Sequence, residues 1–438
     1  MQVVASFRTG RTCSRALVLA LAGACFAGTA AAQAPTASGP WFGVMLPPPM
    51  VYHELEVLSE RPPAPAVVPQ GEERFTELSG ANMRRDLATI VDFARESRRT
   101  REVGDGGIWG RITGFPSGNK TIEWATEQFR AAGIRDVEVQ PISQAANAGI
   151  TLPVSWEVRL LGDLAFGAGS RDIVLESAMP LSDPDLPPEG ITAPLVYVGT
   201  ATPAELARVD VRGKVAVQKA IPQAHTVFIR SPVGPRAEDL LERGALAVLT
   251  VIDLPGNMRV NDMGCGAGPC FNLGGRDGLF LEQVLSAAAE RGTPDAVRVR
   301  LRLDNERFTG LSSANGVAVI PGTTLPNEYI VINAHADSWF DGAGDNGDGL
   351  AVAVALARHF ARPDVRLERS VVLVASAGHH SAGLSGPGSF VAMNQDIVEN
   401  AVLFINLEHT AQRNITPART SHEDGYREWT MDTGESPI

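Results

Sequence analysis

Hydrophobic positions along the chain follow two different periods. Apolar side chains recur three and four residues apart in Met83, Leu87, Ile90, Val91 and Ala94, and again in Ile122, Ala125, Phe129 and Ala132. This spacing predicts two amphipathic helices, the second ending before Gly133. The stretch "DVEVQPI" that follows this glycine alternates between polar and apolar residues, which is typical of a strand.

The last third of the chain has a different pattern. Short and nearly unbroken apolar runs predict four strands, "NGVAVIPG", "EYIVINAH", "SVVLVASAG" and "AVLFINLEH". Between the second and third run, "GLAVAVALARHFARP" predicts an apolar helix that stops before Pro363. Apolar strands alternating with buried helices indicate the α/β class, with a mixed and mostly parallel sheet covered by helices on both faces.

The middle of the chain, residues 189–305, reads as an independent β-rich insert. "APLVYVG" and "VRGKVAVQ" predict strands, and "AEDLLERGALAVLTVID" predicts a helix that runs into another strand. Before the first helix, residues 33–77 form a proline-rich stretch, with nine prolines between residues 35 and 69. We expect an extended linker or arm there.

Residues 1–32 have the features of a signal peptide. Arg8, Arg11 and Arg15 precede the apolar run "ALVLALAGACFAG", and small alanines follow at residues 30–32. The run is too short to cross a bilayer, and no later stretch is long and apolar enough to do so. We therefore expect a protein exported to the periplasm or secreted, without a membrane span; a lipidated Cys25 is the weaker alternative.

Composition narrows the classes of partner. The 438-residue chain can form two domains, and its formal net charge is −12. It contains no cluster of lysine and arginine, so nucleic acid is a poor candidate partner. Of the four cysteines, Cys265 and Cys270 lie outside the leader, and in an oxidising compartment we expect them to form a local disulfide.

Polar residues with metal-binding chemistry follow three of the predicted strands. "NAHADSWFDGAGDNGDGL" places His335, Asp337 and Asp345 after one strand, with four aspartates and four glycines in eighteen residues. His379 and His380 follow the next strand, and Glu408 follows the last, with His409 beside it. Ligands collect at the carboxyl ends of the strands in such sheets, and imidazole with carboxylate is the donor set of zinc.

Each of these residues also has an ordinary structural explanation. His335 could be a hydrogen-bonded histidine at a strand end, Asp337 could cap a turn, and Glu408 could be a solvated strand terminus. His379 and His380 could be surface residues, and we interpret His53, His225 and His359 as structural. Convergence of histidines and carboxylates at one sheet edge favours the metal site.

The motif "HADSWFDGAGDNGDG" resembles that of the zinc-dependent exopeptidases, the family of leucyl-type aminopeptidases and glutamate carboxypeptidase. The resemblance runs from residue 78 to the end of the chain. "GRITGFPSGNKTIEWATEQFRAAGIRDVEVQ" resembles the family's first helix-and-strand segment, and residues 189–305 resemble an inserted protease-associated domain. This divides the peptidase-like domain into residues 78–188 and 306–438, and we expect the second part to be incomplete.

The resemblance implies a role for each polar residue. His335 would bind the first zinc ion, Asp345 would bridge to a second, Glu408 would be a further ligand, and Asp337 would orient His335. His379 and His380 stand where the family has two glutamates, so His379 would act as general base and His380 as ligand. Only His409 and His422 remain as candidates for the family's last histidine ligand. One zinc ion is the better-supported number, and two are possible.

The function implied is that of an exported, aminopeptidase-like exopeptidase that cleaves peptides near a chain end through zinc-activated water. The alternative is a catalytically lapsed relative that binds peptides or another ligand, because the glutamate pair is replaced. A third possibility is another acyl transfer on one zinc ion, such as cyclisation of an N-terminal residue.

Overall fold

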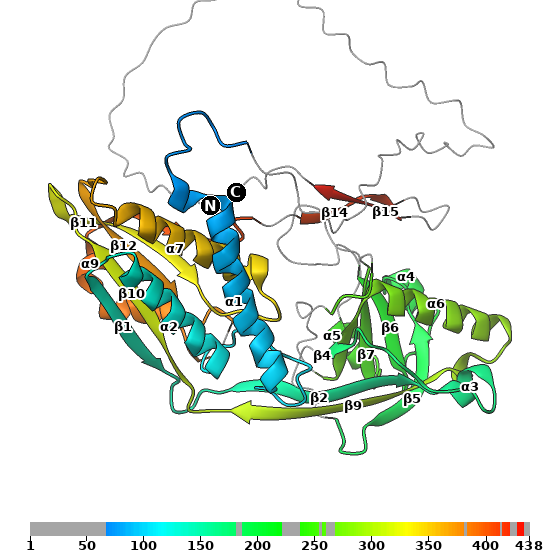
Figure 1. Cartoon of the computed structure of the whole chain (residues 1–438). Helices are drawn as coiled ribbons and strands as arrows, with labels where there is room; N and C mark the ends of the chain where they lie inside the picture. Colours follow the sequence, from blue (N-terminus) through cyan, green and yellow to red (C-terminus); the bar gives the residue numbers. More distant parts are fainter. Residues whose placement is uncertain are drawn as a thin grey trace, which may run out of the picture. The chain divides into compact units, whose positions relative to one another are not determined.

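The computed structural model describes residues 67–180, 186–220, 237–253, 256–259, 268–380, 383–411, 414–420 and 427–432. Figure 1 draws these residues in colour along the sequence. The predicted leader and most of the proline-rich segment lie outside the described residues. The same holds for Cys265 and for three of the histidines considered above, His53, His225 and His422.

A five-stranded sheet carries the candidate site. Its order is β1 (Asp136–Ser143), β10 (Ser312–Ile320), β12 (Arg369–Ser376), β11 (Leu325–His335) and β13 (Ala401–Asn406). Strand β11 is parallel to both of its neighbours, whereas β10 is antiparallel to β12 and β1. The predicted α/β class with a mixed sheet is therefore confirmed, and the parallel pairs are the ones that surround β11.

Helices cover both faces of this sheet, as the unbroken apolar strands predicted. On one face, Ile332 and Leu373 join the cluster of Phe129 from α2 (Pro116–Ala131) and Leu350 from α7 (Asp348–Phe360). The opposite face packs against α8 (Gly386–Met393) and α9 (Gln395–Glu399). The long helix α1 (Gly80–Thr100) lies on α2 and α7 (Figure 1).

An eight-stranded sheet is formed by the middle of the chain. Its order is β3 (Ile173–Val174), β2 (Ile150–Leu160), β9 (Arg298–Phe308), β5 (Ile191–Tyr197), β6 (Val215–Ala220), β7 (Ala247–Ile252), β8 (Cys270–Leu273) and β4 (Met179–Pro180). The strands β5 to β8 are mutually parallel. The first strand of this sheet thus begins at Ile150, whereas the insert was placed at residues 189–305; the domain boundaries stay a prediction.

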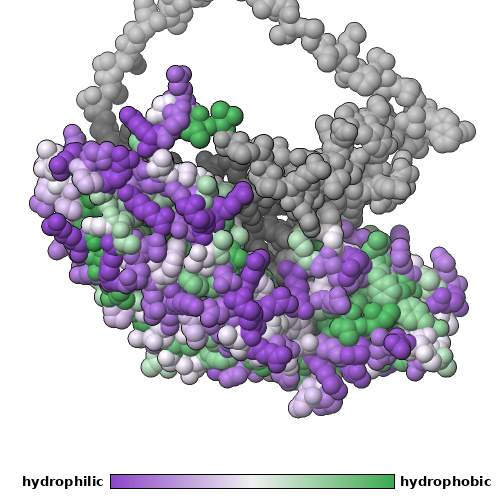
Figure 2. Space-filling view, in the orientation of Figure 1, coloured by the Kyte–Doolittle hydropathy of each residue, from purple (hydrophilic) through white to green (hydrophobic). Residues whose placement is uncertain are grey.

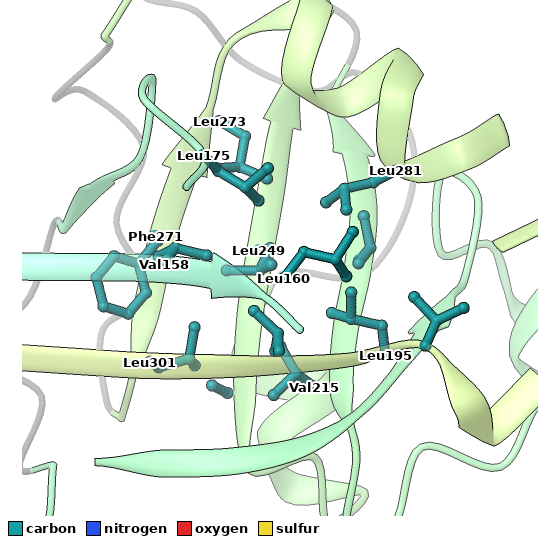
Figure 3. Packing of buried hydrophobic residues seen from close by; sticks show 14 of the residues in the cluster. Val158, Leu160, Leu175, Leu195, Val215, Leu249, Phe271, Leu273, Leu281 and Leu301 are labelled. Atoms are coloured by element: carbon teal, nitrogen blue, oxygen red, sulfur yellow. The ribbon is translucent and has the colours of Figure 1, made fainter. Parts of the chain in front are cut away.

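A large apolar cluster packs against the eight-stranded sheet. Figure 3 shows Val158 and Leu301 from the antiparallel pair β2–β9 beside Leu249 and Phe271 from the parallel strands. Leu281 from α6 (Gly275–Glu290) closes the cluster, whose labelled members are at most 2% exposed. Shorter helices are α3 (Gly162–Phe166), α4 (Pro203–Leu206) and α5 (Ala237–Glu242).

Figure 2 shows hydrophilic residues over most of the visible face of the described part. None of the described helices has the length and hydropathy needed to cross a bilayer.

Cys270, at the start of β8, is disulfide-bonded, as predicted from the sequence. Its expected partner, Cys265, is not among the described residues.

Candidate metal centre

The three parallel strands of the five-stranded sheet bring their carboxyl ends to one edge. His335, the last residue of β11, lies beside Ser376 at the end of β12. Two residues earlier, Asn333 pairs with Asn406 at the end of β13. The chain segments that follow these ends carry His379, His380 and Glu408, so strand register alone gathers the predicted site residues.

His335 lies at the centre of this edge. Its Nε2 atom is 3.2 Å from Oδ1 of Asp345 and 3.4 Å from Oε1 of Glu408. The side chain is only 3% exposed, and Nε2 has no partner in hydrogen-bond geometry among the described residues. A buried imidazole nitrogen without such a partner, facing two carboxylates, fits a divalent cation such as zinc.

Asp337 connects the ends of two strands. Its Oδ1 atom is 3.3 Å from Nδ1 of His335. Its two carboxylate oxygens also accept hydrogen bonds from the backbone amides of His379, at 3.2 Å, and His380, at 2.8 Å. The orienting role predicted for Asp337 toward His335 fits this contact, and the carboxylate additionally fixes the segment after β12.

The loop between His335 and Asp345 is held by a residue that the sequence analysis did not single out. Arg111 is fully buried and donates hydrogen bonds to the carbonyl oxygens of Ala336, Asp341 and Gly342 at 2.9, 3.1 and 2.9 Å. No carboxylate forms an ion pair with it among the described residues. Burial lowers the pKa of Arg111 to about 10. Its guanidinium therefore acts as a rigid clamp on backbone carbonyls.

Asn346 links that loop to the end of β13. The residue is fully buried, and its Nδ2 atom donates a 2.8 Å hydrogen bond to the carbonyl oxygen of Leu407. Close packing here requires glycine at position 349, since a Cβ atom would lie 2.3 Å from Oδ1 of Asn346 and 2.5 Å from the Leu407 carbonyl. The glycine-rich stretch is visible in the sequence, but the sequence did not indicate that this stretch packs against the end of β13.

Two groups of potential ligands share His335. One is His335, Asp345 and Glu408, and the other is His335, His379 and His380; within each group the donor atoms lie within 4.8 Å of one another. His380 Nε2 is also 3.1 Å from Oδ1 of Asp345. The structure thus brings together all the residues predicted to bind metal; their roles as ligands stay a prediction.

The other two described histidines, His359 and His409, have different surroundings. His409 contacts Glu408, with 3.6 Å between Nε2 and Oε1, but it belongs to neither group of potential ligands. His359 lies in α7, where Nδ1 is 2.7 Å from Oε1 of Glu77 and the ring packs edge-on against Phe75. This position agrees with the structural interpretation of His359.

Charges at the site stabilise one another. Burial alone would lower the pKa of His335, but the neighbouring carboxylates of Asp337, Asp345 and Glu408 raise it. Burial would raise the pKa of Asp345, yet its contacts with His335 and His380 lower it far below the usual carboxyl range. Contact with His335 likewise lowers the pKa of Glu408. The carboxylates are therefore ionised at neutral pH and can bind a cation.

Comparison with known proteins supports the same kind of site. The family described as Peptidase family M28 matches residues 315–433, a segment that starts in β10 and contains every predicted site residue. The predicted resemblance to the zinc exopeptidases is confirmed. This segment contains most of β10 and all of β11, α7, β12 and β13.

The chain matches only part of the length of each individual relative. The chain is 24% identical to carboxypeptidase Q of Bos taurus over 250 residues, which is 55% of this chain and 48% of that protein. It is 29% identical to Aminopeptidase NAALADL1 of Mus musculus over 128 residues, 28% of this chain and 17% of that protein. The chain thus spans about half or less of the curated relatives it matches.

A solved structure confirms the fold. The crystal structure of a peptidase M28 precursor from Shewanella amazonensis SB2B aligns with a TM-score of 0.51 at 20% sequence identity, covering 74% of each chain. Similarity at this level establishes the shared α/β architecture. It leaves the chemistry to be argued from the site residues themselves.

Proposed function

We propose that this chain is a metal-dependent exopeptidase that hydrolyses peptide bonds near a chain end. The observation that carries the proposal is the meeting of His335, Asp345 and Glu408 at the edge of the sheet inside the M28 segment. The curated relatives include both a carboxypeptidase and an aminopeptidase by name, so the proposal concerns exopeptidase chemistry, with an aminopeptidase as the prediction from the sequence.

The donor set suits zinc. His335, Asp345 and Glu408 would hold the ion, and His380 lies within reach beside Asp345. When bound, zinc lowers the pKa of a water molecule toward about 7 and polarises a substrate carbonyl. The buried Nε2 of His335, without a hydrogen-bond partner among the described residues, supports this assignment.

The protein's own groups provide orientation and acid–base chemistry. Asp337 fixes the ring of His335 and the backbone of His379 and His380. Burial and the neighbouring rings lower the pKa of His379, so its ring is neutral at pH 7 and can accept a proton. The general-base role of His379 is thus chemically feasible, and it is a proposal.

A catalytically lapsed, ligand-binding protein is the second candidate. One observation favours it: positions 379 and 380 carry histidines, where the family resemblance implies a glutamate base and a glutamate ligand. A neutral base does not stabilise a developing ammonium group as a carboxylate does.

The proposal for the whole chain has two further parts. The predicted signal peptide would direct export, and residues 189–305 would form a protease-associated domain.

Peptide hydrolysis by the zinc-loaded full chain tests the proposal. Aminoacyl-nitroanilides and peptides with free or blocked ends would be used as substrates, beside His335→Ala and the control His359→Gln. We expect hydrolysis that requires a free chain end, is lost in His335→Ala and persists in the control. Stoichiometric zinc without turnover of any substrate would contradict the proposal. Activity that appears only in the double variant His379→Glu/His380→Glu would favour the ligand-binding alternative.

A further inference from the structure

Three imidazole rings gather at the candidate metal centre. Ring centroids are 4.3 Å apart for His335 and His379, 4.7 Å for His379 and His380, and 5.2 Å for His335 and His380. One nitrogen of each ring lies within 4.8 Å of the other two. Zinc–nitrogen bonds of about 2.0–2.1 Å place two bound nitrogens no more than about 4.2 Å apart, so small ring rotations would let all three share one ion.

One carboxylate contacts all three histidines, at the ring of one and at the backbone of the other two. Asp337, 2% exposed, lies 3.3 Å from Nδ1 of His335 and accepts hydrogen bonds from the backbone amides of His379 and His380. Nδ1 of His335 thus faces Asp337, and its buried Nε2, beside Asp345 and Glu408, has no partner in hydrogen-bond geometry among the described residues. A buried nitrogen without such a partner, next to two carboxylates, is a further sign of a bound ion.

The charge at the site fits one ion better than two. Of the three carboxylates at the site, Asp337 is engaged by the ring of His335 and by two backbone amides, so Asp345 and Glu408 are left to balance a single dication. A second dication would need the glutamate ligand that the family resemblance places at position 380, and a histidine stands there instead. Two dications at the usual two-metal spacing of about 3.5–4 Å repel each other strongly without that carboxylate.

We propose that His379 is a ligand of a single metal ion shared with His335 and His380, so that the site is nitrogen-rich and selects a zinc- or copper-type cation. Imidazole donors suit zinc, copper and nickel, and affinity among these divalent ions is highest for copper. This role replaces the general-base role predicted for His379, since the bound nitrogen cannot also take a proton. The inference rests on the metal site of the proposed function and is independent of peptide hydrolysis.

Electron paramagnetic resonance of the copper-loaded full chain tests the assignment. Nitrogen hyperfine structure counts the coordinated imidazoles directly. We expect three nitrogens in the parent, two in His379→Ala and three in the control His359→Gln, whose ring contacts Glu77. The His379 side chain is 48% exposed, so its removal should leave the fold intact; His379→Gln repeats the test should the alanine variant unfold. Two nitrogens in the parent, or the same count in parent and His379→Ala, would overturn the proposal.

Zinc binding gives a second readout. Equilibrium dialysis should give one zinc per parent chain, and the dissociation constant should rise at least about tenfold in His379→Ala, the lower end of what even indirect ligand partners cause. Two zinc ions per parent chain would contradict the single-ion site. A three-nitrogen copper signal without peptide cleavage would refute the proposed function and keep this inference. Peptide cleavage with an unchanged nitrogen count in His379→Ala would do the reverse.

Discussion

The side-chain amide of Asn346 donates a hydrogen bond to the carbonyl oxygen of Leu407 across 2.8 Å. Each of these residues is the direct neighbour of a candidate ligand, Asp345 in one case and Glu408 in the other. The bond therefore fixes the distance between two segments that are 61 positions apart in the chain. We therefore expect metal binding by both carboxylates to depend on this hydrogen bond.

Gly349→Ala should disrupt this contact. The new methyl group would lie 2.3 Å from Oδ1 of Asn346 and 2.5 Å from the Leu407 carbonyl, so the two segments must separate. We expect a loss of about 1–3 kcal/mol in the free energy of unfolding, as for overpacked cores, together with weaker zinc binding. Urea denaturation and zinc titration measure the two effects.

The control is Gly80→Ala, at the start of α1, where a Cβ atom would meet nothing within 4 Å. Its stability should be unchanged or higher by up to about 1 kcal/mol. Equal effects of the two glycine variants would show that the contact between residues 346 and 407 does not hold the site together.

Asp337→Asn should weaken metal binding more than it weakens the fold. An amide has one acceptor oxygen in place of two, so it cannot accept both backbone hydrogen bonds, and its NH₂ group would face a donor. We expect zinc affinity to fall about 10–100-fold, as measured by competition with a chromophoric chelator. Asp341→Asn, in the same loop but in an exposed ion pair with Arg95, is the matched control and should bind zinc like the parent.

Arg111→Lys should loosen the loop between His335 and Asp345. A lysine ammonium lacks the planar fork that reaches three carbonyl oxygens. Loss of hydrogen bonds from a charged group costs about 1.5–3 kcal/mol, and zinc affinity should fall with it. The measurement is denaturation with and without zinc, from which the stabilisation by the ion is obtained.

Arg358→Lys is the control that separates an effect on the loop between His335 and Asp345 from a general loss of stability. Arg358 is partly buried; its ion pair with Asp86 joins α7 to α1, and its hydrogen bond to Gln128 joins α7 to α2. Its replacement should lower stability but leave the increment from zinc unchanged. A similar loss of zinc stabilisation in both lysine variants would argue against a specific role of Arg111.

Glu77 should contribute a pH-dependent part of the stability. Its contacts with His359 and Arg362 outweigh burial and lower its pKa from 4.5 to about 2. Because the folded-state pKa is depressed, the contribution is complete above about pH 4.5 and is lost as the pH falls toward 2. Glu77→Gln should cost about 1–2 kcal/mol at pH 7 and progressively less between pH 4.5 and 2.

Urea denaturation of parent and variant at several pH values measures this difference. Glu127→Gln is the control, since its ion pair with Arg130 is exposed and contributes little. A difference between parent and Glu77→Gln that stays constant down to pH 2 would contradict the lowered pKa.

Strand ends were predictable from the sequence because hydrophobicity reports them directly. The predicted runs "EYIVINAH", "SVVLVASAG" and "AVLFINLEH" became β11, β12 and β13, although β12 ends two residues and β13 three residues before its run does. Parallel pairing then brought the polar residues together. The strand β9 was not predicted, although "RVRLRL" alternates as a half-buried strand does. Its partner β2 is distant in the sequence, since the paired residues Leu160 and Val299 are 139 positions apart. Neither sequence segment alone therefore indicated the long antiparallel ribbon.

Contacts made through the backbone could not be predicted. The hydrogen bonds from the amides of His379 and His380 to Asp337 depend on the path of a loop, which residue types do not encode. Arg111 lies in a segment noted only for its family resemblance, and nothing in "WGRITG" indicates that three carbonyls from a distant loop surround the side chain. Such residues act through geometry that only the folded chain provides.

The position of Asp337 between two strand ends has a consequence for how this site can change. Replacing His379 and His380 changes the possible metal ligands that follow β12. The carboxylate of Asp337, which accepts hydrogen bonds from the backbone amides of these two residues, also contacts the ring of His335 at the end of β11. Substitutions that retune the metal preference are therefore constrained to leave residue 337 untouched, and diversity among related sequences should concentrate in the side chains at 379 and 380.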